Sequence, residues 1–281
     1  MQLLDYEHKI SSRSESLNIW GLGDFHLGCS ACLEKLLNTN IHKIKKDPNA
    51  VVFLLGDYAD FINISDKRFD GKTIASWLTL KDLDNLAIRQ CDKVIEYLIP
   101  IADKIIGGCS GNHETKILRK YHFDPTEYII TNLRKYSKKM IVNLGYGVSV
   151  CRVKIKRGRE TRTIFVNVAH GSSGAITVGG SMNRIIKSSQ NLNSDIILRG
   201  HTHQLTVLQQ SRLRIPASGK LQIVDAPQIL VQCGSYMRTY QEGVAGYGEV
   251  KEYLPSILGS PEIQIFPQNT LSYNVNLHTN K

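Results

Sequence analysis

Several features of membrane and secreted proteins are missing from this sequence of 281 residues. It has no run of about 18 consecutive apolar residues, which a transmembrane helix would need, so we expect no membrane partner. The first residues, MQLLDYEHKISSRSES, lack the apolar core behind a basic start that marks a secretory signal. We therefore expect a cytoplasmic protein. Hydrophobic residues make up 42% of the chain and charged residues 21%, a balance that excludes a disordered or fibrous protein.

Cysteines are few and widely spaced, and without a secretory signal we expect them to be reduced thiols. Cys29 and Cys32 form one C-x-x-C pair. A zinc ribbon would need a second such pair, which the sequence does not contain. The pair is either structural or incidental, or it has a redox or metal role, and the sequence leaves both interpretations open.

Acidic residues are scarce in one part of the chain. The whole chain has 35 Lys and Arg against 25 Asp and Glu, a net charge of +10. Between residues 134 and 220, however, 16 basic residues face only Glu160 and Asp195, and the densest run lies at 152–162. A long stretch of one sign attracts an anionic partner, most commonly nucleic acid. A solvated basic hairpin without a ligand is the alternative for the densest run.

Short apolar segments alternate with helical patterns, which predicts an α/β fold (α+β layered). The predicted strands are Leu17–Leu22, Val51–Leu55, Lys104–Gly107, Thr163–Ala169 and Asp195–Leu198. The predicted helices are Ala31–Lys46, Leu83–Ile99 and Pro125–Lys139, with apolar residues on one face of the first two.

The second half of the chain predicts strands without long helices between them. Val148–Ile155 and Thr163–Val168 read as a hairpin, and further strands are expected at Leu205–Leu213, Leu221–Val224 and Ile229–Cys233. We expect a single domain over residues 1–281. In it, residues 238–281 form an irregular extension packed on the body, with a last strand at Leu271–Leu277.

Five short polar motifs follow the predicted strands. They are Gly23-Asp24-Phe25-His26, Gly56-Asp57-Tyr58-Ala59-Asp60, Gly111-Asn112-His113-Glu114, His170-Gly171 and Gly200-His201-Thr202-His203. In an open α/β sheet, ligands gather at the carboxyl ends of strands, so the five motifs can meet in one crevice.

The motifs together offer seven oxygen and nitrogen ligands and no thiolate. The ligands are Asp24, His26, Asp57, Asn112, His170, His201 and His203. This set suits Mn²⁺ first, with Fe, Zn²⁺ or Ni²⁺ as alternatives. Seven ligands are too many for one tetrahedral zinc, but two ions about 3.5–4 Å apart would share them. Such a pair generates hydroxide from water near neutral pH and clamps a phosphoryl group during in-line attack.

The ordered series of motifs resembles that of the calcineurin-like metallophosphoesterases, which runs D-x-H, G-D-x-x-D, G-N-H-E/D, H and G-H-x-H. The resemblance covers residues 17–207 and implies a β-sandwich flanked by helices. It assigns Asp24, His26 and His203 to one metal, and Asn112, His170 and His201 to the other. Asp57 would bridge the two ions.

The resemblance also implies roles for residues that do not bind metal. His113 would sit beside the phosphate as an electrophile or as the acid that protonates the leaving group. Asp60 would orient a ligand or His113, although it could instead cap a helix. Glu114 would either support the site or stabilise a helix N-terminus.

Three basic residues are candidate phosphate contacts because they lie close to the motifs in the sequence. They are Arg184, Lys187 and Arg199, and Asn112 and His113 would bind substrate as well. Arg184 follows a Gly- and Ser-rich segment, 171–183, which is either a mobile substrate loop or a solvent loop.

The motifs define the reaction and not its substrate. The basic stretch favours phosphodiester bonds in nucleic acid, hence a nuclease or phosphodiesterase. Against this, aromatic residues make up only 7% of the chain and do not alternate with basic ones as in a stacking platform. A phosphatase acting on phosphoprotein or a small phosphorylated molecule is the alternative. A silent scaffold is disfavoured, since all the metal ligands are present.

Overall fold

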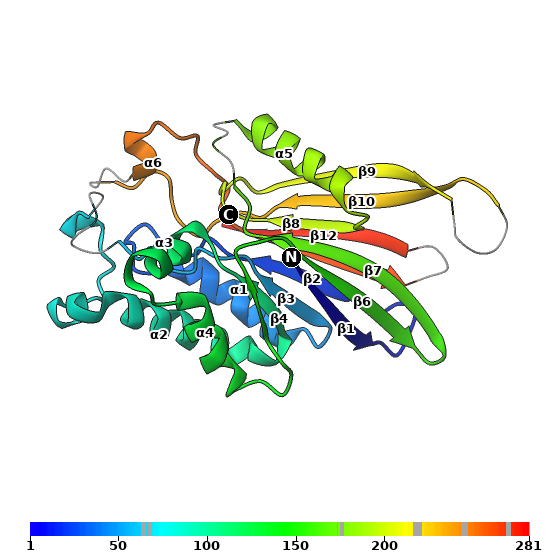
Figure 1. Ribbon diagram of the computed structural model, residues 1–281, viewed down its shortest axis with the longest axis horizontal. Coiled ribbons are helices and arrows are strands. Elements are labelled where there is room, and N and C mark those ends of the chain that lie inside the picture. The colour runs from blue at the N-terminus through cyan, green and yellow to red at the C-terminus, as the bar shows by residue number, and fades with distance from the viewer. Residues whose placement is uncertain are drawn as a thin grey trace.

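Two six-stranded sheets pack against each other, and helices cover their outer faces (Figure 1). The computed structural model describes residues 1–62, 66, 69–172, 174, 177–215, 221–242, 247–267 and 271–280. In this part of the chain, no helix is both long enough and apolar enough to cross a membrane. The mixed α/β architecture confirms the predicted fold class.

The first sheet has the strand order β1-β6-β7-β8-β10-β9. Its strands are β1 (Gln2–Lys9), β6 (Ser149–Arg157), β7 (Glu160–Ala169), β8 (Ile196–Arg199), β9 (Thr206–Arg214) and β10 (Val224–Gln232). Helix α5 (Val178–Asn191) packs on its outer face, where Met182 and Ile185 contact Ile197 and Leu230.

The second sheet has the order β12-β11-β2-β3-β4-β5. Its strands are β2 (Leu17–Leu22), β3 (Ala50–Leu54), β4 (Ile105–Cys109), β5 (Val142–Gly145), β11 (Gly259–Pro267) and β12 (Leu271–Thr279). The remaining helices are α1 (Glu34–Lys46), α2 (Leu86–Leu98), α3 (Asn112–Tyr121), α4 (Pro125–Arg134) and α6 (Tyr247–Val250), with 3₁₀ turns at Gly71–Thr73, Leu80–Asn85 and Ile99–Lys104.

Strand β2 shows how the layers form. All six of its residues are buried, and successive side chains point to opposite faces. Leu17 and Ile19 join the core between the sheets, while Trp20 and Leu22 join the core under α1, α2 and α4. A strand covered on both sides reads as a continuous apolar run, which is why its bounds could be predicted correctly.

Other elements depart from the predictions. Residues 221–224 and 229–233 were expected as separate strands, but β10 runs through Pro227 as one strand. Helix α2 begins only at Leu86, after a 3₁₀ turn, and α4 ends at Arg134 rather than at residue 139. The sequence did not indicate β1, β5, α3 or α5.

The C-terminal residues contribute to the second sheet. Strand β11 pairs with β2 in antiparallel register, with Ile263 opposite Ile19, and β12 pairs with β11. Residues 259–267 therefore lie between β2 and β12 in the sheet, whereas we expected an irregular extension. Part of the expected extension, residues 243–246, 268–270 and 281, lies outside the described residues.

Candidate metal centre

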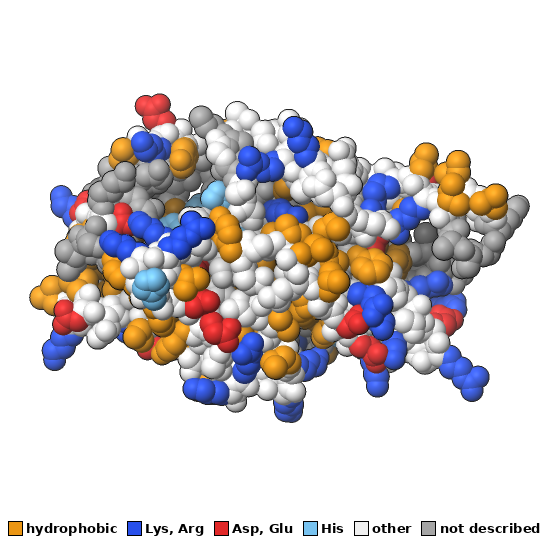
Figure 2. Space-filling model, in the orientation of Figure 1, with side chains coloured by type: hydrophobic (Ala, Val, Ile, Leu, Met, Phe, Trp, Pro, Cys, Tyr) orange, Lys and Arg blue, Asp and Glu red, His pale blue; other side chains and the backbone are white. Residues whose placement is uncertain are grey.

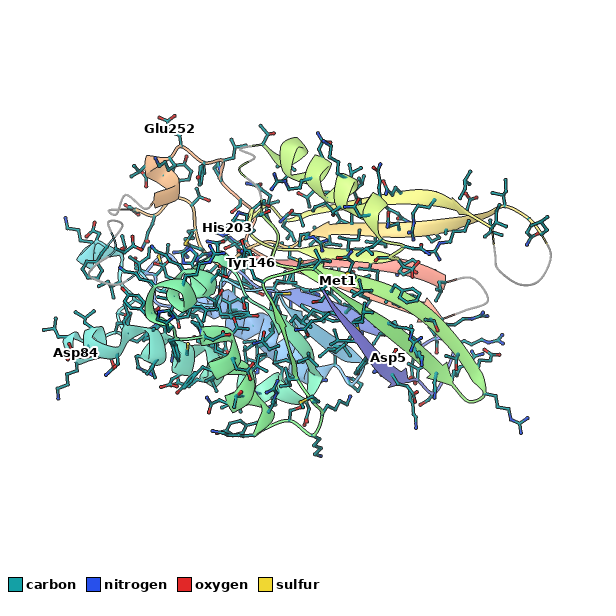
Figure 3. The ribbon with its side chains drawn as sticks, in the orientation of Figure 1. Met1, Asp5, Asp84, Tyr146, His203 and Glu252 are labelled. Carbon is teal, nitrogen blue, oxygen red and sulfur yellow. The ribbon has the colours of Figure 1, made fainter. Side chains whose placement is uncertain are left out.

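All five polar motifs come together at one end of the two sheets. Asp24 and His26 follow β2, Asp57 follows β3, and Asn112 opens α3 just after β4. From the first sheet, His170 follows β7, and His201 and His203 follow β8. Figure 3 labels His203 at this end of the sheets. The predicted ligands thus come from five strands, three in one sheet and two in the other.

One group of ligands consists of Asp24, His26 and His203, whose ligand atoms lie within 4.8 Å of one another. The Nε2 atoms of His26 and His203 are 3.0 Å apart, and Nε2 of His203 is 3.3 Å from Oδ1 of Asp24. Asp24 and His26 are buried, and His203 is partly exposed.

A second group consists of Asp57, His170 and His201, again within 4.8 Å of one another. Oδ1 of Asn112 lies 3.0 Å from Nε2 of His170 and 2.8 Å from Nδ1 of His201. Oδ2 of Asp57 lies 3.3 Å from Nε2 of His170. On the far side of the ring, Nδ1 of His170 donates to the Leu55 carbonyl at 2.6 Å, which leaves Nε2 as a ligand atom.

These contacts fit metal ions. In each group, ring nitrogens approach one another at 3.0–3.2 Å. Two neutral imidazoles can satisfy such a contact only if one donates, yet carboxylate or amide oxygens converge on the same point. Convergent imidazole nitrogens and oxygens without a thiolate are a donor set for Mn²⁺, Fe, Zn²⁺ or Ni²⁺.

The charges in the site favour a cation. Asp24 and Asp57 are 0% and 2% exposed. Burial raises the pKa of Asp57, but the charges of His170 and His113 outweigh it and hold that pKa well below its usual range. Burial likewise lowers the pKa of His170, yet the Asp57 and Asp24 carboxylates raise it to about 10. Ionised carboxylates buried this fully need positive charge beside them.

The backbone is strained at the ligands. Five of the seven have positive φ angles without being glycine: Asp24, His26, Asp57, His201 and His203, at 50–74°. Each such residue costs of the order of 1–3 kcal/mol and persists only where its surroundings hold it. Hydrogen bonds between the loops provide this support, because Asp24 N donates to the Gly56 carbonyl at 2.9 Å and His201 N donates to Asp24 Oδ2 at 3.0 Å.

Gly111 allows the third motif to approach the second. A Cβ at Gly111 would lie 2.1 Å from Oδ1 of Asp57, so no other residue fits there without displacing that carboxylate. The same oxygen accepts a hydrogen bond from His113 N at 2.9 Å. The start of α3 therefore fixes the orientation of Asp57.

His113 and Asp60 lie beside the first group. The centroids of the His113 and His26 rings are 4.9 Å apart, and the rings meet edge to face. Nδ1 of His113 contacts the Asp60 carbonyl at 2.5 Å. A carbonyl only accepts, so Nδ1 carries a proton and donates it to this contact. Oδ1 of Asp60 lies 3.6 Å from Nδ1 of His26 and 3.8 Å from Nδ1 of His113.

Glu114 holds two of the ligand loops together. Its buried carboxylate accepts three backbone N–H groups, from Asp57 at 2.9 Å, Tyr58 at 2.8 Å and Gly111 at 2.8 Å. Burial and the nearby Asp57 charge raise its pKa to about 7. It thus positions the backbone on both sides of the predicted metal ligands Asp57 and Asn112.

The two arginines lie in different surroundings. Arg184, on α5, donates to Oγ of Ser172 at 3.1 Å and so reaches the segment that follows His170. Arg199 is 6% exposed, and its Nη2 donates to Oδ1 of Asn167 at 2.8 Å. Its guanidinium also bonds the carbonyls of Asn167 and Leu198, so these hydrogen bonds stay within the first sheet and do not reach the metal ligands. Residues 173, 175 and 176 of the expected loop lie outside the described residues.

A basic pocket opens next to the second ligand group, and the sequence analysis did not identify it. It has a volume of about 430 Å³ and is lined by Asn112, Thr115, Lys116, Arg119, Lys120 and Tyr146. Figure 2 shows Lys and Arg side chains gathered over α3. The available signal was the spacing of Lys116 and Arg119, four and seven residues after Asn112, which places them on one helix face.

The densest basic run lies elsewhere. Residues 152–162 form the hairpin of β6 and β7, and His170 follows the other end of β7. At a rise of ~3.4 Å per residue, the two ends of the ten-residue strand β7 are roughly 30 Å apart. Figure 1 shows this turn at the opposite end of the sheet from α3. Two cations of this basic run also pair with acidic residues of β1, Arg152 with Asp5 and Lys156 with Glu7.

Comparisons with known proteins give a family and several similar solved structures. A family model described as calcineurin-like phosphoesterase matches residues 17–205. No curated protein matches the chain. Similar solved structures include Vps29 from Entamoeba histolytica complexed with Zn²⁺, at 11% identity and a TM-score of 0.37, covering 93% of this chain and 99% of that one. They also include Vacuolar Protein Sorting 29 from Cryptosporidium parvum, at 10% identity and a TM-score of 0.40, covering 95% and 100%. A predicted phosphoesterase from Streptococcus pneumoniae is similar at 11% identity and a TM-score of 0.35, and the match covers 94% of this chain and 90% of that one.

Proposed function

The chain belongs to the calcineurin-like phosphoesterase family, and we propose that it hydrolyses phosphodiester bonds in nucleic acid with the help of two divalent metal ions. As a member of that family it is a metal-dependent hydrolase of phosphate esters. The observation that carries the finer proposal is the basic pocket that shares Asn112 with the metal ligands. A cationic pocket that opens from the reacting centre suits a substrate whose negative charge extends beyond the scissile phosphate.

In this proposal the two ligand groups hold one ion each. Asp24, His26 and His203 would hold the first, Asn112, His170 and His201 would hold the second, and Asp57 would be shared by both. Mn²⁺ suits this set best, with Fe, Zn²⁺ or Ni²⁺ as alternatives. When bound, the ions would supply a water of lowered pKa and neutralise charge on the phosphoryl oxygens.

His113 acts on the leaving group. In this proposal the His113 imidazolium keeps one proton on Nδ1, which donates to the Asp60 carbonyl, and gives the other from Nε2 to the departing oxygen, which leaves the ring neutral. Asp60 orients both His113 and His26 from behind. Asn112 and His113 contact the scissile phosphate, and Arg184 approaches it from the segment after His170. We do not include Arg199 among these contacts, because its guanidinium already bonds Asn167.

A panel of substrates tests the proposal. With added Mn²⁺, we would compare bis(p-nitrophenyl) phosphate, p-nitrophenyl phosphate, and single- and double-stranded DNA and RNA. We expect hydrolysis of bis(p-nitrophenyl) phosphate and of nucleic acid, which Asp57→Asn abolishes. Asp225→Asn is the matched control, since Asp225 lies on β10 and bonds Ser211. Turnover of the monoester alone would refute the proposal.

A phosphatase is the second candidate. It is favoured by the position of the densest basic run, whose turn is roughly 30 Å from His170 along β7, at ~3.4 Å per residue. The net charge of the chain therefore overstates the positive charge near the metal ligands. A phosphatase would cleave p-nitrophenyl phosphate and phosphopeptides and leave oligonucleotides intact.

A further inference from the structure

The basic pocket beside the metal ligands has a defined shape. One wall is α3, and the other includes Tyr146, from the loop between β5 and β6. Asn112 belongs to both the pocket and the second ligand group. A substrate whose phosphate lies at the metal ions could therefore extend directly into the pocket.

The cations follow the axis of α3. Thr115, Lys116, Arg119 and Lys120 lie three, four, seven and eight residues after Asn112 and share its face of the helix. At 1.5 Å per residue, Lys116 is roughly 6 Å and Arg119 roughly 10 Å from Asn112 along the axis. Lys116 and Arg119 therefore lie at increasing distances from Asn112 along the helix.

Partners hold some of these side chains in place. Lys116 pairs with Asp66, and Nζ of Lys120 lies 5.1 Å from the centre of the Tyr121 ring. Arg119 is exposed on the pocket face. Its guanidinium has the planar fork of donors that suits a phosphate.

Tyr146 adds an aromatic ring to this basic wall. The residue is 46% exposed, although it lines the pocket. Its loop is attached to the end of β4, because Ser110 N donates to the Gly145 carbonyl at 2.8 Å, and Gly145 has a φ of 65°. Figure 3 labels Tyr146 and His203 at the same end of the sheets. The fold thus pairs an aromatic residue with cations about 30 positions away in sequence.

We propose that this pocket is the subsite for the nucleotide next to the scissile phosphate in a single strand. Arg119 would bind its phosphate, and its base would stack on Tyr146. This inference rests on the proposed function and names the form of nucleic acid. Cationic grooves with exposed aromatic rings are the usual way to hold single strands. A base in a duplex is paired and stacked and does not reach a pocket of about 430 Å³.

Three variants and a control test the subsite. We would measure KM for an eight-nucleotide single strand of thymidine with Mn²⁺, and KM for bis(p-nitrophenyl) phosphate in parallel. Tyr146→Ala should raise the oligonucleotide KM by roughly 5- to 100-fold through lost stacking, and Tyr146→Phe should restore it. Arg119→Ala should raise it too and reduce the slope of log KM against log salt by about 0.7. Each change should exceed the effect on the small diester.

Arg159→Ala is the matched loss of one positive charge, on the β6–β7 hairpin. If Arg159→Ala raises the oligonucleotide KM as much as Arg119→Ala does, the subsite is refuted and the proposed function is unaffected. The same holds if Tyr146→Ala and Arg119→Ala change the KM values of the oligonucleotide and of bis(p-nitrophenyl) phosphate equally. Equal KM values for single strand and duplex would refute it as well.

The subsite can fail or succeed apart from the proposed function. If the unchanged protein does not cleave the thymidine strand, the phosphorothioate analogue of that strand is tested as an inhibitor of bis(p-nitrophenyl) phosphate hydrolysis. Inhibition that depends on Arg119 and Tyr146 would support the subsite while refuting nuclease activity. Absence of both cleavage and inhibition would refute both.

Discussion

Replacing Glu114 by Gln should destabilise the protein strongly, although the change is isosteric. The carboxylate accepts Tyr58 N on Oε1, and Asp57 N and Gly111 N on Oε2. An amide keeps only one acceptor oxygen, so at least one buried N–H loses its partner and the new NH₂ gains none. A buried donor left unsatisfied costs about 1–3 kcal/mol. Removing a charge close to Asp57 offsets part of this, and we expect a net loss of about 2–4 kcal/mol.

Urea unfolding of the metal-free protein at pH 8 measures this loss directly. For a chain of this size, the loss corresponds to a fall in Tm of roughly 4–12 °C. Mn²⁺ should also bind more weakly, because Glu114 holds the Asp57 backbone. Glu96→Gln is the control: Glu96 pairs with Lys93 at the surface, and its loss should cost less than about 1 kcal/mol. A change for Glu114→Gln as small as that of the control would refute the reasoning.

Three further predictions concern catalysis, metal and pH. His113→Ala should keep its metal content and lose turnover by roughly 10²–10⁴-fold, and a variant that matches the parent rate would remove its assigned role. Chelation should abolish turnover and lower the free energy of unfolding, by about 2.7 kcal/mol relative to protein with free metal at 100 times its Kd, and added Mn²⁺ should reverse both effects. Burial raises the pKa of Glu262, but hydrogen bonds from His278 and Asn276 outweigh it and leave that pKa below its usual value. A carboxylate with a lowered pKa stabilises the fold at pH values above its unfolded pKa, and this stabilisation is lost as the pH falls through the folded pKa. Glu262→Gln should therefore cost more stability at pH 7 than at pH 3 in urea titrations.

The meeting of the five motifs could be predicted because it follows from local rules. Each motif comes directly after an apolar strand, and parallel strands such as β2 and β3 end at the same edge. The strained backbone at Asp24 and Asp57 could not be predicted, because only the contacts between loops hold it.

Features that depend on distant contacts were missed. Arg199 is next to a metal motif in sequence, yet its side chain bonds Asn167 of the neighbouring strand β7. Tyr146 approaches α3 only because β5 pairs with β4. Helix α5 was obscured by Gly179 and Gly180 in its first turn, which have low helix propensity.

The position of β11 in the second sheet affects how the enzyme folds during its synthesis. Strand β2 carries Asp24 and His26 at its end, and its neighbours are β3 and β11. A ribosome therefore translates all seven predicted metal ligands well before residues 259–267 emerge to cover one side of β2. During that interval the nascent chain presents a bare, apolar strand edge that invites wrong pairing, so chaperones should be needed until the final hairpin closes.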